Sequence, residues 1–410
     1  MFAGRPAGSW DTALQLAGAI ATEGQPEPNV DPADRLAIEQ LARVAELHVG
    51  EVTGRSVEEP VRIEALNRTQ WAKRFLDEER PLLEELSGSI GAALQSQLGD
   101  LGSEDFTEID LQQPTLPGMP PEALIKQLMG MMGPMLLGMM AGSTAGHLAT
   151  RALGHYELPL PRPAHEPLTL VLRNVDEFAD DWTLPREAIR LWVCLSDVAH
   201  QHVLNLEHVR AHLDGLLGEY VSAFSQDPAE IERRMRGLGI DEDLGGSEPE
   251  LEALQRLAGD PDVLLSAMQS EAQLLLMPRI AAVVATVEGY VDWVLDTLGG
   301  RLIPEYDRVT EALRRRRAEA GPASRFVERL FGLELSQGTF DRGSLFVDGI
   351  VERSGTQALS QLWTDEAHLP TPAELDAPGL WLARVGIESH DLDLDDLPEF
   401  EIPDFPDMDS

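Results

Sequence analysis

Two long apolar segments, residues 186–204 and 270–298, constrain this chain more than any other feature. Both have the length and the spacing of apolar residues that favour α-helix. A helix that is hydrophobic over most of its circumference has to be buried, so other helices must surround these two. We therefore expect a mainly helical fold with few short strands and with these two segments at its centre.

The rest of the sequence fits a helical fold, because helical patterns alternate with Pro- and Gly-rich breaks. Further helices are expected over residues 32–54, 67–86, 205–220 and 304–335. Polar or Pro-rich connections are expected over residues 99–123, 155–168 and 225–262. The best strand candidates are residues 168–172 and 181–184.

The 410 residues are expected to form an N-terminal helical extension (1–66), a large helical domain (67–386) and an acidic tail (387–410). We expect the tail to be disordered, because it is acidic, divided by prolines and without Lys or Arg. A short acidic and hydrophobic motif that binds a partner is the alternative reading of the tail.

Composition excludes several classes of function. The chain has 32 Lys and Arg against 71 Asp and Glu, a formal net charge of -39, which argues against nucleic-acid binding and membrane-surface binding. Its single cysteine, Cys194, cannot form an internal disulfide. The first residues lack the pattern of a secretory signal, so we expect a cytoplasmic protein.

Residues 127–150 carry no formal charge and are rich in Met and Gly, so their length could cross a membrane. Pro134 and the glycines instead favour a buried pair of helices, in which small residues allow close approach and Met fills gaps. A methionine-lined binding groove would give the same pattern.

A polar step, Ser196-Asp197-x-x-His200, interrupts the apolar segment 186–204. Residues 196 and 200 share one helix face. This is the spacing of H-E-x-x-H, in which two histidines bind zinc and the glutamate is the general base. By itself the step does not define a metal site, because an inward-facing histidine is most often a core residue with hydrogen-bond partners.

The second apolar segment carries Glu288 and Asp292 one helical turn apart. Burial of two carboxylates costs several kcal/mol unless they are paired or bind a cation. They could bind a metal together with His200, or hydrogen-bond to His200, His202 or an arginine. We expect Gly289 to permit close helix approach and Arg314–Arg317 to form a solvated face. His208 and His212, which we expect on a solvent-exposed helix, could form a separate metal site.

Four ordered stretches resemble one protein family. They are ALGHYELPLP (152–161), AIRLWVCLSDVAHQHVL (188–204), TVEGYVDWVLD (286–296) and the closing region 326–386. Over residues 70–386 the chain resembles an actinobacterial family of zincin-like hydrolases that carry the label zinc-dependent metalloprotease. Part of that family is associated with deazaflavin-cofactor genes.

The resemblance implies a zincin-like helical domain with zinc as cofactor. It places the first zinc histidine at Ser196, the general base at Asp197 and the second zinc histidine at His200. The third ligand falls at Glu288, with Asp292 as its supporting partner. Serine is a poor zinc ligand, and Asp reaches about 1.5 Å less far than Glu, where misplacement near 1 Å costs ~100-fold in rate.

We therefore expect a degenerate peptidase centre with weak or absent zinc, in a protein that is inactive or weakly active and binds a peptide or protein in the old cleft. The alternative is a working hydrolase with an oxygen-rich metal site built from His200, Glu288, Asp292 and Asp197. A third reading is an interaction protein that uses its acidic tail. Side-chain tips of His200 and Glu288 closer than roughly 6 Å would indicate a shared cluster.

Overall fold

The computed structural model describes residues 7–55, 60–86, 88, 138–163, 166–224, 269–319 and 322–387. Four predicted features lie outside these residues. They are the connection 99–123, the connection 225–262, residues 127–137 of the uncharged stretch, and the acidic tail from residue 388.

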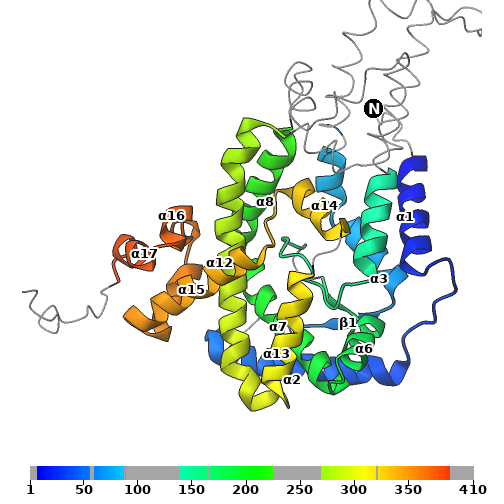
Figure 1. Cartoon of the computed structure of the whole chain (residues 1–410), viewed down its shortest axis with the longest axis horizontal. Helices are drawn as coiled ribbons and strands as arrows, with labels where there is room; N and C mark the ends of the chain where they lie inside the picture. Colours follow the sequence, from blue (N-terminus) through cyan, green and yellow to red (C-terminus); the bar gives the residue numbers. More distant parts are fainter. Residues whose placement is uncertain are drawn as a thin grey trace, which may run out of the picture.

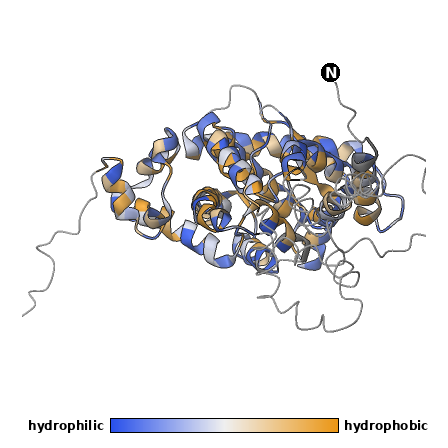
Figure 2. Cartoon of the chain, turned by 90° about the horizontal axis from the view of Figure 1, so that it is seen from above, coloured by the Kyte–Doolittle hydropathy of each residue, from blue (hydrophilic) through white to orange (hydrophobic). Residues whose placement is uncertain are grey.

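The two apolar segments form the central helices, α7 (Arg186–Leu204) and α12 (Glu271–Leu302). Around them pack α2 (Pro32–Thr53), α8 (Glu207–Ser222) and α15 (Gln337–Ser354). α12 runs through the middle of the molecule in Figure 1. Hydrophobic segments meet inside the body in Figure 2, while hydrophilic ones lie along its outside. The prediction of a mainly helical fold with few strands is confirmed.

Among the described residues, α12 is the one helix with the length and hydropathy of a membrane span, and 72% of its most apolar window is buried inside the protein. Burial against its neighbours accounts for this hydrophobicity. Within the stretch 127–150, the described residues 138–149 form a helix. A Cβ atom on Gly142 would lie 2.5 Å from the Ala13 carbonyl oxygen in α1 (Ala7–Ala21), so small residues do allow close helix approach there.

Two short strands pair in parallel, β1 (Ile63–Leu66) and β2 (Leu168–Val171), with Ile63 opposite Leu168. The strand predicted over 168–172 is confirmed, and β1 was not predicted. The strand over 181–184 is wrong, because α6 (Leu172–Asp181) ends there in a turn with Thr183 at φ +53. The boundary expected at residue 66 falls inside one continuous core, since β1 pairs with β2 and α2 packs on α7.

The single helix predicted over 304–335 is wrong, because two helices form there, α13 (Tyr306–Ala318) and α14 (Pro322–Phe331). α14 begins at Pro322, and proline is favoured in the first turn of a new helix. α16 (Pro372–Leu375) and α17 (Pro378–Arg384) lie with α15 on one side of α12, away from the rest of the body (Figure 1).

Helices α12 and α15 cross with almost no side-chain volume between them. A Cβ on Gly289 would lie 2.2 Å from the backbone carbon of Gly343, and a Cβ on Gly343 would lie 1.9 Å from the Ala285 carbonyl oxygen. The close approach expected at Gly289 is therefore present. Phe340 lies one turn before Gly343 on α15, so this crossing also fixes the Phe340 ring, which contacts Arg317 of α13.

Candidate active-site cavity

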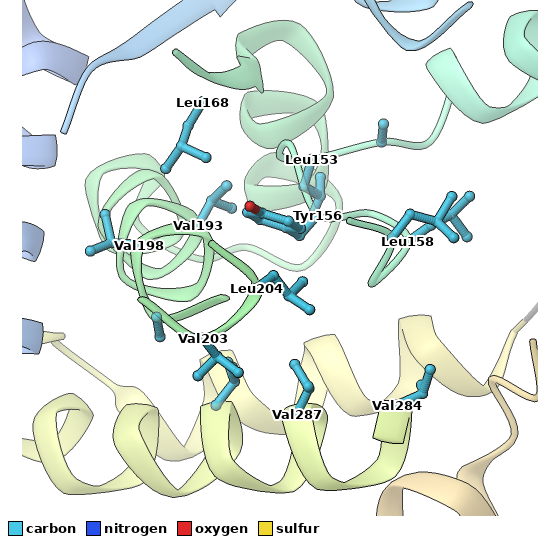
Figure 3. Close-up of a cluster of buried hydrophobic side chains, with 14 of the residues drawn as sticks. Leu153, Tyr156, Leu158, Leu168, Val193, Val198, Val203, Leu204, Val284 and Val287 are labelled. Atoms are coloured by element: carbon cyan, nitrogen blue, oxygen red, sulfur yellow. The ribbon is translucent and has the colours of Figure 1, made fainter. Parts of the chain in front are cut away.

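A cavity of about 110 Å³ lies between α7, α12, α13 and the segment 148–159. Its apolar lining consists of Leu148, Leu153, Leu158, Pro159, Trp192, Val193, Leu313, Leu335 and Phe340. Its polar lining consists of Arg151, Tyr156, Glu157, Ser196, Asp197, His200, Glu288, Arg316, Arg317 and Glu328. Figure 3 shows Tyr156 between Val193 of α7 and the loop residues Leu153 and Leu158. A concavity that combines apolar surface with converging polar groups is a candidate ligand site.

His200 and Glu288 meet in this cavity although 88 residues separate them. The His200 Nε2 lies 3.2 Å from Glu288 Oε1, while its Nδ1 donates a hydrogen bond to the Ser196 carbonyl oxygen at 2.8 Å. The Tyr156 ring stacks on the imidazole with ring centres 5.3 Å apart. The structure therefore brings together the two side chains that were expected to cluster.

His200 and Glu288 each favour the charged form of the other. Burial acts to lower the pKa of His200, but Glu288, the hydrogen bond to the Ser196 carbonyl and Asp197 together raise the pKa above its ordinary value. Burial acts to raise the pKa of Glu288, but His200 and Arg317 bring that pKa below its ordinary value. Both shifts favour the charged form, so this buried contact favours an ion pair of imidazolium and carboxylate.

Ser196 lies beside this pair and lines the cavity. Both ring nitrogens of His200 are already engaged, one by a backbone carbonyl and one by Glu288. Neither nitrogen can therefore accept the proton of the Ser196 hydroxyl in this arrangement. The geometry does not support a serine nucleophile activated by His200.

Asp197 is held by backbone groups of the neighbouring loop. Its Oδ2 accepts from the His155 N–H at 2.8 Å and its Oδ1 accepts from the Tyr156 N–H at 3.1 Å. A Cβ on Gly154 would lie 2.4 Å from the carboxylate, so the loop packs directly on it. Burial raises the pKa of Asp197 to about 6, although the two N–H groups act to lower it. Both oxygens of this carboxylate serve to anchor the loop.

Asp292 has an arginine as its partner. Arg317 Nη1 donates to both Asp292 oxygens at 3.1 Å, and its Nη2 lies 3.8 Å from Glu288 Oε2. The solvated face expected for the arginine run is wrong in part: Arg314 and Arg315 are exposed, but Arg316 and Arg317 are partly buried and line the cavity. Sequence reasoning missed Arg317, and the signal for it was the need of Glu288 and Asp292 for counter-charge.

The other histidines stay apart from this centre. His202 faces α2, where its Nδ1 lies 3.2 Å from Thr53 Oγ1, and burial lowers its pKa to about 4. His212 pairs with Glu366 at 2.9 Å. In the part of the chain that the structure describes, no group of three or more His, Cys, Asp or Glu side chains is arranged to hold a metal ion.

The residues present do not complete a zinc site. His200 and Glu288 are zinc-ligand types, but the third position holds the neutral hydroxyl of Ser196. Asp292 is already paired with Arg317, and Asp197 already accepts two backbone N–H groups. Arg317 also places a positive charge next to Glu288.

A second buried polar cluster lies behind the loop and was not predicted. Arg162 Nη1 donates to Glu79 at 2.6 Å and to Glu78 at 3.3 Å, and Arg162 Nη2 donates to the His155 carbonyl oxygen at 3.3 Å. Burial raises the pKa of Glu79 to about 7, although Arg162 acts to lower it. This cluster fixes the loop that carries His155 and Tyr156.

Comparison with known proteins agrees with this fold. The profile of the zincin-like metallopeptidase family matches residues 9–382, so the chain belongs to that family. Among solved structures, it is similar to the crystal structure of a "putative hydrolase with a novel fold" from Chloroflexus aurantiacus. The TM-score is 0.62 at 20% identity, over 92% of this chain and 99% of that chain, which shows a shared fold. No curated protein matches the chain.

Proposed function

We propose that this protein is a zincin-like family member whose peptidase centre is degenerate. It is inactive or weakly active, its zinc binding is weak or absent, and it binds a peptide or protein segment in the retained cavity. One observation carries the proposal: His200 and Glu288 pair with each other, and in the described chain no third ligand-type side chain is free to join them. The narrower grouping with actinobacterial, deazaflavin-associated members and the cytoplasmic location are part of the same proposal.

The retained cavity supports a binding role. Its apolar walls provide contact area, and the Ser196 hydroxyl and the Arg317 guanidinium offer donors to an incoming backbone carbonyl. Glu288 offers an acceptor to a backbone N–H. A peptide amide, which has both a donor and an acceptor, suits this lining better than a simple ion does.

Metal content and peptide hydrolysis test the inactive centre. We expect purified protein to contain substoichiometric zinc and to leave a random peptide library uncleaved in mass spectrometry, with or without added zinc. Stoichiometric zinc that disappears in His200→Ala, together with hydrolysis that disappears in the same variant, would contradict the proposal.

Selection from the same peptide library tests the binding role. Peptides enriched on the wild type should lose affinity at least about tenfold for Ser196→Leu, which fills part of the cavity. Thr297→Leu, on the exposed side of α12, is the matched control and should bind normally. Equal binding to both variants would place the peptide site elsewhere.

A working metal-dependent hydrolase is the second candidate. It is favoured by the 3.2 Å between His200 Nε2 and Glu288 Oε1, because two ligands of one tetrahedral zinc are about 3.3 Å apart. Manganese, magnesium and zinc should then each be tested for restored hydrolysis. The third reading, a partner motif in the tail, concerns residues outside those described and predicts that removal of residues 388–410 abolishes capture of a partner.

A further inference from the structure

We propose that Arg317 is the resident cation of this centre and excludes divalent metal ions from it. This inference rests on the proposed loss of the zinc centre and goes one step further. It assigns the exclusion to a residue outside the degenerate motif, on a helix that the motif does not include.

Arg317 occupies the position between the two carboxylates where a metal ion would be expected. Its guanidinium is shared between two carboxylates of α12, with Nη1 at 3.1 Å from both Asp292 oxygens and Nη2 at 3.8 Å from Glu288 Oε2. The side chain is 19% exposed, and Glu288 is 7% exposed. These groups are thus largely shielded from water, where Coulomb interactions are stronger than at the surface.

Packing holds the guanidinium in place. The Phe340 ring lies 5.1 Å from Arg317 Cζ, in the geometry of a cation–π contact. Phe340 is set by the glycine crossing of α12 and α15, which leaves little freedom for α15 to move away. Arg317 is therefore fixed between three helices and is not a surface side chain that solvent could draw out.

The charge of Arg317 disfavours a divalent cation at this centre. Glu288 and Asp292 together carry two negative charges, which would match a divalent cation. Zinc binding would displace the proton of His200, but Arg317 would still compensate one of these charges, and its guanidinium adds direct repulsion to a divalent cation. Replacement of Ser196 by histidine would supply the missing ligand type but would leave this repulsion unchanged.

Zinc titration calorimetry on four variants tests the inference. Ser196→His alone should bind zinc weakly. Ser196→His with Arg317→Gln should bind it roughly 10- to 100-fold more tightly, because one positive charge near the ligands is gone. Ser196→His with Arg317→Lys keeps the charge and should resemble Ser196→His. The matched control is Ser196→His with Arg314→Gln, which removes an exposed arginine of the same helix.

Circular dichroism shows whether each variant is folded. If Arg317→Gln destabilises the fold through its unpaired carboxylates, adding Asp292→Asn removes the main partner as well, and zinc binding should again exceed that of Ser196→His. Equal zinc affinity with and without Arg317 would overturn the inference while leaving the proposed function intact. Stoichiometric zinc in the wild type would refute both the inference and the proposed function.

Discussion

At the scale of single residues, the two polar side chains of the Asp197-x-x-His200 step have different roles in the structure. His200 faces Glu288 in the cavity, whereas Asp197, three residues earlier, anchors the loop through the N–H groups of His155 and Tyr156. A shared helix face could be predicted from spacing. The loop that occupies Asp197 could not, because no local pattern links residues 155 and 197.

Asp197→Asn should destabilise the protein by about 1–3 kcal/mol. An asparagine has one acceptor oxygen, so its amide nitrogen would face a backbone N–H of the loop. Urea unfolding measures the loss, and Asp341→Asn, at an exposed position of α15, is the control with a change within about 0.5 kcal/mol. An Asp197→Asn variant as stable as wild type would mean that the loop does not depend on this carboxylate.

Glu79→Gln should change how stability depends on pH. Burial raises the pKa of Glu79 from 4.5 to about 7, so the protonated form is favoured in the folded state. Its contribution is complete below about pH 4.5 and is lost as pH rises towards 7, by up to about 1.4 kcal/mol per pH unit. Relative to Glu79→Gln, the wild type should lose stability across this window in urea unfolding at several pH values. Glu39→Gln, exposed on α2, should show no such pH-dependent difference.

At the scale of elements, hydrophobic patterns predicted the helices that form the core but missed the division between α13 and α14 and the strand β1. The apolar residues of segments 186–204 and 270–298 predict two buried helices, and α7 has the predicted bounds. β1 is as short as β2, but one of its faces is partly exposed, whereas all four residues of β2 are buried, so β1 lacks the apolar run that made β2 recognisable. A run of four arginines is normally solvated, so the sequence pattern predicts exposure for all four. Tertiary contacts partly bury two of them: Arg317 pairs with Asp292 of α12, and Arg316 donates to Glu157 Oε1 at 2.7 Å and to the Arg151 carbonyl oxygen at 2.6 Å.

Gly343→Ala should destabilise the protein by at least about 1–3 kcal/mol, because the added methyl group would meet the Ala285 carbonyl oxygen at 1.9 Å. Gly300→Ala is the matched control in α12. A methyl group there would point into open space with no neighbouring segment within 4 Å, and alanine is favoured in a helix by about 0.5–1 kcal/mol. Thermal unfolding of both variants checks the crossing, and similar melting temperatures would argue against close packing there.

At the scale of the whole molecule, the excess of acidic residues sets the response to salt. A net charge of -39 produces self-repulsion, which dissolved ions screen. We expect the melting temperature to rise by several degrees when sodium chloride is increased from about 0.05 to 0.5 M. Potassium chloride at the same concentration should raise the melting temperature equally, because screening depends on ionic strength and not on which monovalent cation is present. A fall in melting temperature would show that ion pairs such as Arg317–Asp292 outweigh the general repulsion.

Trp192 lies in the cavity wall and is 9% exposed. The protein therefore contains its own optical reporter at the place where a ligand is expected. A bound peptide would remove the remaining water from the indole and shift its fluorescence emission to shorter wavelength. The difference spectrum between wild type and Trp192→Phe would separate this signal from that of the other six tryptophans.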